Sequence, residues 1–278
     1  MKSSRAVTTL LRYLGLTALM LVFVFPLWWM LSYSLRPIGL PAPTHLELIA
    51  LPLTFDNYAR VSQYISLSRF FGNSLAVAGL AVPLTVVTAS WAGLALAHAA
   101  RAEQATLITL SVAALLMPAS ALWMPRFILF SHLGWLDSFV PLVLPALMGT
   151  SPFYVLLFYF AFARVPLEFY ESAQLDGANP FQVWYWLALP LARPAVIAVA
   201  TLSFAFYWGN YADPLLYLQT EAHYTLPLGM KLLEMARPSD FPILMAASAI
   251  VIAPVVFLFA FAQRFFLQGQ ITLERWLN

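Results

Sequence analysis

The sequence contains no cysteine, and only 9% of its 278 residues are charged. Without cysteine the chain can form neither a disulfide framework nor a cysteine-based metal site. Its histidines are His45, His98, His132 and His223, which lie far apart and lack the spacing of metal ligands. We therefore expect no metal site. The net charge of +2 is too small to indicate nucleic acid as a partner.

Apolar residues take the place of the missing charges, because 62% of the chain is hydrophobic. An ordinary soluble domain carries about 25% charged residues, and a soluble fold of this size could not cover so much apolar surface. A membrane helix needs about 20 mostly apolar residues. The sequence thus predicts an all-α polytopic membrane protein, with a single transmembrane domain over residues 1–278. Its six predicted spans are residues 13–35, 70–97, 105–129, 138–163, 194–216 and 241–264.

The N-terminus suggests how the chain is oriented in the membrane. Lys2, Arg5 and Arg12 precede the first apolar run. That run is longer than the roughly 7–15 residues of a signal-peptide core, so we expect it to remain as a span. Basic residues favour the cytoplasmic side. With six spans, both termini are predicted to be cytoplasmic, as is the loop 164–193 between the fourth and fifth spans.

This loop contains the polar stretch "ESAQLDGANP" (Glu171–Pro180). Asp176-Gly177 indicates a turn, with Gly177 suited to a left-handed helix terminus. Asn179-Pro180 is typical of the cap and first position of a new helix. The residues Phe181, Trp184, Tyr185 and Ala188 then follow helical spacing. We expect two short helices joined by a turn, and from the residues alone an amphipathic hairpin resting on lipid is an equal alternative.

The longer stretch "ESAQLDGANPFQVWYWLALP" resembles the cytoplasmic loop of ABC importer permeases. That motif reads Glu-Ala-Ala, three residues, Gly, nine residues, Ile, one residue, Leu-Pro. Here a serine replaces one alanine and a leucine replaces the isoleucine, while the spacing is complete. In such permeases the loop docks in a cleft of the cytoplasmic ATP-binding subunit. The resemblance implies a coupling role for Glu171, Ser172, Ala173, Asp176, Gly177, Leu187 and Pro190.

Other segments extend the resemblance over nearly the whole chain. "FGNSLAVAG", "LLMPASALWMPRFILFSHLGWLDS", "YTLPLGM" and "MAASAIVIAPVVFLFAFAQRFFLQG" are similar to carbohydrate-uptake permeases of the maltose-permease second-subunit type. Two segments depart from the family pattern. The fifth span carries "YWGNYADPLLYL" in place of a Trp-Asn-Asp-like segment, and the tail is "QITLERWLN".

The resemblance implies a non-catalytic subunit in the plasma membrane of a prokaryote, which is the inner membrane in a Gram-negative cell. It would pass a sugar or oligosaccharide inward by alternating access. The implied partners are a second permease subunit, two ATP-binding subunits, an external solute-binding protein, the sugar and the lipid bilayer. The chain has no Gly-x-x-x-x-Gly-Lys-Ser/Thr motif. It is therefore expected to bind no cofactor, while ATP and Mg²⁺ belong to the partner subunits.

Polar residues within spans are functional candidates, and they indicate where a solute could pass. Hydrogen-bonding side chains beside aromatic rings suit an oligosaccharide. Each of these residues also has a structural alternative, such as helix packing or anchoring at the membrane interface. The substrate-path candidates are Asn73, Arg126, Tyr207, Trp208, Asn210, Tyr211 and Asp213.

Other functions remain open at this point. An ABC permease for an amino acid, a peptide or a polyol phosphate would share the loop motif. A membrane enzyme would need paired acidic residues or a His-Glu-x-x-His helix within the spans, and neither occurs in the sequence. A secondary carrier could use six spans per repeat, but its loop 164–193 would then be unexplained.

Overall fold

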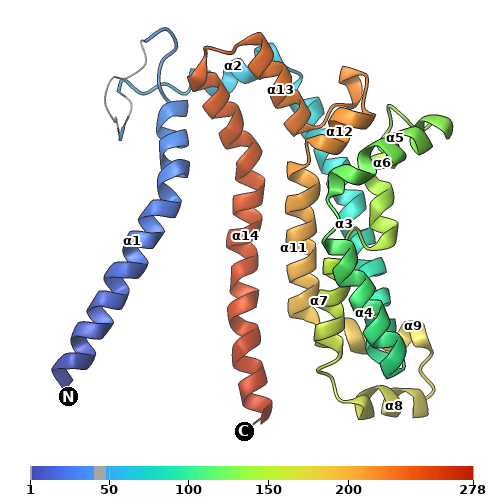
Figure 1. Ribbon diagram of the computed structural model, residues 1–278. Helices are drawn as coiled ribbons and strands as arrows, with labels where there is room; N and C mark the ends of the chain where they lie inside the picture. The colour runs from blue at the N-terminus through green and yellow to red at the C-terminus, as the bar shows by residue number, and fades with distance from the viewer. Residues whose placement is uncertain (1, 41–47, 50, 278) are drawn as a thin grey trace. The chain divides into compact units, whose positions relative to one another are not determined.

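The computed structural model describes residues 2–40, 48–49 and 51–277. Within these ranges every regular element is a helix, which confirms the predicted all-α fold (Figure 1). The chain divides into two compact units. The smaller unit comprises residues 1–67 and 229–253, and the larger unit comprises residues 68–228 and 254–278.

The smaller unit is organised around the end of its first helix. It contains α1 (Lys2–Ser34), α2 (Asp56–Tyr64), most of α13 (Leu226–Ala236) and the first part of α14 (Phe241–Leu277). The last carbonyl groups of a helix lack partners within that helix. The buried side-chain amide of Asn57 donates to the backbone oxygens of Ser34 and Arg36, at 2.7 and 2.8 Å. Helix α2 therefore caps α1.

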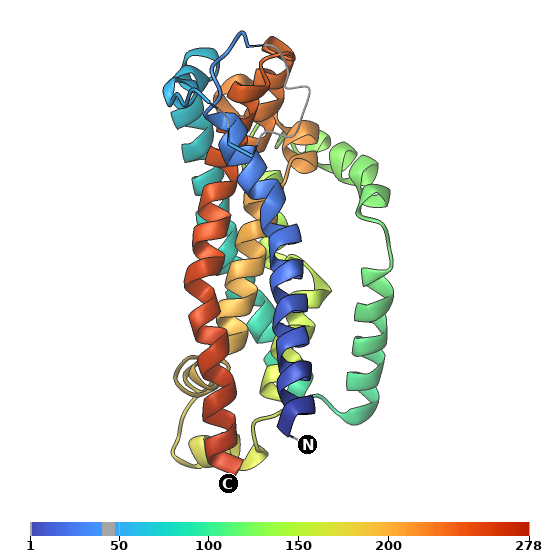
Figure 2. The same cartoon turned by 90° about the vertical axis from the view of Figure 1, so that its left-hand side faces the viewer.

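The larger unit holds the loop and all of the predicted path residues. Figures 1 and 2 show α8 and α9 at one end of this unit, with α5 and α12 at the opposite end. Its helices are α3 (Leu67–His98, from its second residue), α4 (Arg101–Leu115), η1 (Ala119–Leu122), α5 (Trp123–His132), α6 (Val140–Val143), η2 (Leu144–Met148), α7 (Pro152–Phe162), α8 (Leu167–Leu175), α9 (Pro180–Gln182), η3 (Val183–Ala188), α10 (Leu189–Leu191), α11 (Arg193–Gly209), α12 (Ala212–Tyr217) and η4 (Glu221–His223), together with the start of α13 and the rest of α14.

Four helical segments are long and apolar enough to cross a membrane: Thr9–Ser34, Leu67–His98, Val140–Phe162 and Phe241–Phe265. Two bent helix pairs also pass the test of length and composition. They are Arg101–Leu115 with Ala119–His132, and Pro180–Leu191 with Arg193–Gly209. The described residues therefore offer four spans, or six if each bent pair counts as one.

The third predicted span, 105–129, differs from a single straight helix. Helix α4 ends at Leu115, and the axis changes direction by 91° before η1 and α5. Figure 2 shows α4 and α5 separated by this turn. Pro118 explains the break, because proline has no N–H to donate and disfavours helical backbone in the residue before it.

The fifth predicted span, 194–216, also ends earlier than expected. Helix α11 stops at Gly209, and Asn210 has extended backbone angles (φ −68°, ψ 119°). The side-chain oxygen of Asn210 then accepts the backbone N–H of Asp213 at 3.2 Å, in the first turn of α12. Residues 210–216 thus form a cap and a separate short helix instead of continuing α11.

The fourth span is interrupted by two left-handed residues, Gly149 (φ 71°) and Thr150 (φ 61°). Thr88 of α3 supports this break, because its hydroxyl accepts the Gly149 N–H at 3.1 Å and lies 2.6 Å from the Ala146 carbonyl oxygen. The Thr150 hydroxyl in turn lies 2.7 Å from that of Tyr207 on α11. The break therefore ties three membrane helices together.

Two clusters of buried side chains form the core of the larger unit. The loop-end cluster joins α3, α7, α8, η3 and α11 through Ala89, Tyr154, Phe158, Phe162, Tyr170, Val183, Ala188, Ala192 and Val199. The far-end cluster comprises Val77, Ala78, Ala81, Phe130, Leu142, Ala146, Tyr207, Tyr217, Leu218 and Leu228.

Helices α3 and α7 approach so closely at Gly93 that a side chain does not fit there. A Cβ atom would lie 2.6 Å from the Phe158 Cβ and 2.9 Å from both the Tyr159 nitrogen and the Val155 oxygen. We expect Gly93→Ala to cost about 1–3 kcal/mol, because the two backbones must separate. The melting temperature of the purified, assembled complex is the measurement.

Gly79→Ala is the matched control, because Gly79 lies in the same helix and its added Cβ would meet nothing within 4 Å. Replacing a helical glycine with alanine at an unobstructed position is neutral or stabilising by up to about 1 kcal/mol. Equal melting temperatures for the Gly93 and Gly79 variants would contradict the close packing of α3 and α7.

Candidate functional site

The first half of the 164–193 loop is a short helix that ends in a Schellman motif. Helix α8 ends at Leu175, and Gly177 is left-handed with φ 85°. The Gly177 N–H donates to the Gln174 oxygen and the Ala178 N–H donates to the Ala173 oxygen, both at 3.0 Å. These two bonds satisfy carbonyls that the helix end would otherwise leave unpaired. The predicted turn at Gly177 is confirmed.

The second half of the loop begins with a capping box. The side-chain oxygen of Asn179 accepts the Gln182 N–H, and the side-chain oxygen of Gln182 accepts the Asn179 N–H, both at 2.9 Å. Pro180 occupies the first helical turn, as predicted. The role of Gln182 was missed, although an amide three residues after an N-cap is a known sequence signal.

The expected aromatic stripe along this second helix is divided between two faces. Residues 183–188 form the π-helix η3, in which the wider turn changes the helical spacing. Trp184 and Ala188 are buried. Phe181 and Tyr185 remain exposed, and their rings stack at 6.1 Å with an angle of 2° between their planes.

The residues predicted to couple the loop to a partner differ in exposure. Five are exposed and two are half-buried. The exposed five are Glu171, Ser172, Asp176, Gly177 and Pro190, and the half-buried two are Ala173 and Leu187. The loop also exposes large apolar side chains, which is unusual for a protein surface in contact with water. Leu175 is 88% exposed beside the Schellman turn, and Trp186 is 73% exposed.

Aromatic residues hold each half of the loop against α3. In the first half, the buried ring of Tyr170 meets the ring of His98 edge to face at 4.4 Å. In the second half, the Trp184 indole N–H donates to the Ser90 hydroxyl at 3.0 Å. The Trp184 ring also meets Trp91 at 5.3 Å, with 62° between the planes. The loop is thus fixed on its membrane side and exposed at its tip.

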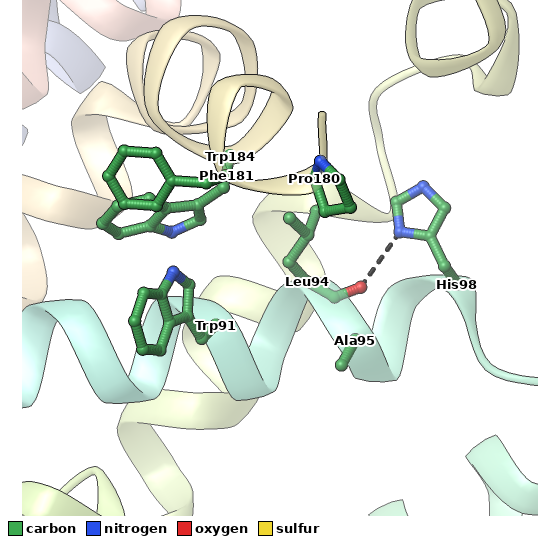
Figure 3. A pocket seen from close by; sticks show the side chains of 7 residues that line it. All are labelled: Trp91, Leu94, Ala95, His98, Pro180, Phe181 and Trp184. Carbon is green, nitrogen blue, oxygen red and sulfur yellow. Dashed lines mark hydrogen bonds between the residues drawn. The ribbon is translucent and has the colours of Figure 1, made fainter. Parts of the chain in front are cut away.

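An open apolar groove of about 400 Å³ lies between α3 and the start of the second loop helix (Figure 3). In Figure 3 the Trp91 ring lies opposite those of Phe181 and Trp184, while the His98 Nδ1 is hydrogen-bonded to the Leu94 oxygen at 3.0 Å. The groove is lined by Trp91, Leu94, Ala95, His98, Pro180, Phe181 and Trp184.

At the opposite end of the unit, Asn73 and two of the predicted aromatic residues take part in local structure. The Asn73 amide donates to the Ala222 and Tyr224 oxygens, both at 2.9 Å. Tyr207 is buried and bonded to Thr150. Trp208 is 1% exposed and packs against Phe71 at 5.2 Å. A role in a substrate path stays a prediction for these residues.

The other path candidates are more accessible. Asn210 donates through its side-chain amide to the Asp213 carboxylate at 2.7 Å, and both residues are half-buried. Tyr211 between them is 37% exposed. Arg126 is half-buried on α5. Figure 1 shows α5, which carries Arg126, and α12, which carries Asp213, at the same end of the larger unit.

Asp137 was missed by the sequence analysis, yet it joins two loops at this same end. Its carboxylate accepts the Gln219 and Thr220 N–H groups and the Thr220 hydroxyl, each at 2.9 Å. The hydrogen bond from the Thr220 backbone N–H is the main cause that holds the pKa of Asp137 well below its usual range. His223 Nδ1 lies 3.2 Å away. Asp137 and Gln219 are 82 positions apart, and no pattern in the sequence indicated that they would meet.

Several curated proteins are similar to this chain over most of its length. The arabinooligosaccharides transport system permease protein AraQ of Halalkalibacterium halodurans is 30% identical over 259 residues, covering 92% of each chain. The lactose transport system permease protein LacG of Rhizobium radiobacter is 26% identical and covers 96% of each chain.

Two solved structures share the fold. One is described as a bacterial ABC transporter involved in the import of the acidic polysaccharide alginate. It matches with a TM-score of 0.78 and 19% identity, covering 95% of this chain and 98% of its own. The other is a bacterial alginate ABC transporter in complex with an alginate pentasaccharide-bound periplasmic protein. Its TM-score is 0.65 at 16% identity, with 91% of this chain and 92% of its own covered.

A family model also matches the chain. Residues 85–271 match the family described as binding-protein-dependent transport system inner membrane component. This range includes the entire 164–193 loop, and it confirms the resemblance on which the coupling residues were predicted. The chain belongs to the family of inner membrane components of binding-protein-dependent transport systems.

Proposed function

We propose that this chain is the permease subunit of an ATP-binding-cassette importer, which passes a sugar or oligosaccharide from an external solute-binding protein into the cytoplasm by alternating access. Family membership supports this assignment, as do relatives whose names specify arabinooligosaccharide and lactose transport. The chain itself is non-catalytic. ATP, with Mg²⁺, binds and is hydrolysed on partner subunits.

The observation that carries the proposal is the construction of the 164–193 loop. Two short helices lie at one end of the larger unit, and the turn between them is fixed by hydrogen bonds to the backbone. Beside this turn, Leu175 is 88% exposed. An exposed apolar tip on a rigid support suits insertion into a complementary cleft. We assign that cleft to a cytoplasmic ATP-binding subunit. The complex would contain two such subunits, one that contacts this chain and one that contacts a second permease subunit.

The topology follows from the same assignment. The bent pair of α4 and α5 forms the third span and α11 forms the fifth, which gives six spans in a single transmembrane domain and places both termini in the cytoplasm. The loop then lies on the cytoplasmic side, where ATP is available. Binding of ATP would close the partner subunits, and the docked loop would move the membrane helices between inward-open and outward-open arrangements.

The substrate path is proposed to run past the opposite end of the larger unit. Asn210 and Asp213 present an amide and a carboxylate beside the exposed ring of Tyr211. Such groups can bond sugar hydroxyls, while the ring packs against the apolar face of a sugar. Arg126, Asn73, Tyr207 and Trp208 complete the proposed path.

Substitution of Gly177 tests the coupling role of the loop. In Gly177→Val, the left-handed backbone would cost about 1 kcal/mol or more, so we expect the turn to rearrange. The reconstituted complex should lose most of its uptake. It should also either release its ATP-binding subunits or lose the stimulation of ATP hydrolysis by the loaded binding protein. All three quantities are measured on the same preparation.

Gly39→Val is the matched control, because Gly39 has the same φ of 85° and likewise has open space around an added Cβ, but lies outside the loop. It should keep its ATP-binding subunits. If Gly177→Val transports normally and also keeps these subunits, the loop is not the coupling element and the proposal fails.

Substitution of Asn210 tests the substrate path. Asn210→Ala removes the amide beside Tyr211, so uptake should fall by about tenfold, the value of one to two hydrogen bonds. Assembly and basal ATP hydrolysis should persist. Ser138→Ala is the control, because the Ser138 hydroxyl makes a local bond, to the Trp135 oxygen at 2.6 Å. Loss of the assembled complex in Asn210→Ala would instead show that Asn210 acts as a structural cap.

A further inference from the structure

The two halves of the 164–193 loop contact α3 by chemically different means. Tyr170 touches His98 through its ring, and no hydrogen-bond partner for its hydroxyl is found among the described residues. Trp184 makes a ring contact with Trp91 and also donates a hydrogen bond to Ser90. A ring contact can slide, whereas a hydrogen bond fixes direction and register.

The bond between Trp184 and Ser90 is buried at both ends. Trp184 is 5% exposed and Ser90 is 0% exposed. The Ser90 hydroxyl lies 2.9 Å from the Val87 oxygen and donates to it, which leaves the serine oxygen free to accept the indole N–H. A buried indole N–H without a partner is costly, so this pair resists separation.

The groove beside this bond limits the other contacts between the second half of the loop and α3. Its apolar walls enclose about 400 Å³ of open space (Figure 3). Phe181 is 57% exposed and Trp91 is 48% exposed, although both line the groove. Packing there is incomplete, so the hydrogen bond at Trp184 is the directional contact.

Helix α3 can carry a displacement from this contact toward the opposite end of the unit. It is a single helix from Leu67 to His98, with Pro83 inside it. Near Ser90, Gly93 brings its backbone against α7, so the two helices are tightly packed. Near its start, Asn73 holds residues 222 and 224. A helix that packs at both sites is a physical route for coupling.

We propose that Trp184, through its hydrogen bond to Ser90, is a positioning residue that transmits movement of the 164–193 loop to α3 during transport. This inference rests on the proposed function, in which the loop docks on an ATP-binding subunit. It adds a specific claim, namely that docking and coupling use different residues. Gly177 shapes the docking tip, whereas the Trp184–Ser90 bond links the docked loop to the membrane helices.

The test removes this bond from either end in the complete reconstituted complex with its loaded binding protein. Ser90→Ala removes the acceptor, and Trp184→Phe removes the donor while keeping an aromatic ring. In both variants the ATP-binding subunits should be retained. The ATP hydrolysed per solute imported should rise about fivefold, the low end of the usual range for coupling between sites. The double variant should be no worse than either single one, because both remove the same bond.

Two control variants separate this role from general destabilisation. Tyr170→Phe removes a buried hydroxyl from the other contact between the loop and α3. Ser203→Ala removes a buried hydroxyl that bonds carbonyl oxygens of its own helix, those of Val199 and Ala200. Both controls should keep the wild-type ratio of ATP hydrolysed to solute imported.

A wild-type ratio in both Ser90→Ala and Trp184→Phe would overturn the proposal, as would an equal change in the controls. If only one of the two variants fails to assemble, the other decides. If neither assembles, the bond serves folding and the proposal is wrong. Normal coupling in these variants, together with the expected defect in Gly177→Val, would overturn this inference alone. Retained subunits and normal transport in Gly177→Val would overturn the proposed function itself.

Discussion

The need to pair backbone polar groups without water governs how this chain can bend. A membrane interior offers no water to a broken helix, so each break needs a partner for its free N–H and C=O groups. The structure supplies these partners from side chains. Asn57 pairs with carbonyls at the end of α1, Thr88 supports the break at Gly149, and Asn210 caps α12. Each of these polar side chains thus pairs with backbone groups at a helix end or a break.

The same constraint explains the form of the 164–193 loop. Its turn and its second helix satisfy their own backbone groups through the Schellman motif and the capping box, so they need no external support. The loop can therefore project its tip while Tyr170 and Val183 remain in the loop-end cluster. A tip that is rigid and also anchored can transmit force, whereas a flexible one would absorb it.

The sequence predicted those features that depend on local chemistry. Gly177, Asn179 and Pro180 have strong backbone preferences, and each takes the expected place. Long apolar runs likewise indicated the helices, because hydrophobicity needs no knowledge of neighbours. Proline and glycine signals at Pro118 and Gly209 were present at the two breaks. However, both residues lie inside long apolar runs, and the predicted spans followed the length of those runs.

The remaining features depend on contacts between distant positions. The π-helix η3 turns Trp184 toward Ser90, a residue 94 positions away, and helical spacing alone could not indicate it. Similarly, Asp137 bonds residues 82 and 83 positions further along. In the candidate path, Trp208 is packed against Phe71. An aromatic residue in a span therefore did not by itself indicate a side chain accessible to a solute. Tertiary packing decided these cases.

The central claim is that the tip of the 164–193 loop contacts an ATP-binding subunit, and site-directed cross-linking tests it most directly. The natural chain has no cysteine, so a single introduced thiol is unambiguous. Leu175→Cys places it at a position 88% exposed on the tip, and Met124→Cys places it at one 68% exposed on α5, at the opposite end of the unit. We predict that Leu175→Cys, and not Met124→Cys, cross-links to cysteines introduced around the cleft of the ATP-binding subunit. Cross-linking from Met124→Cys alone, or labelling of Leu175→Cys by an impermeant thiol reagent from outside the cell, would contradict the account.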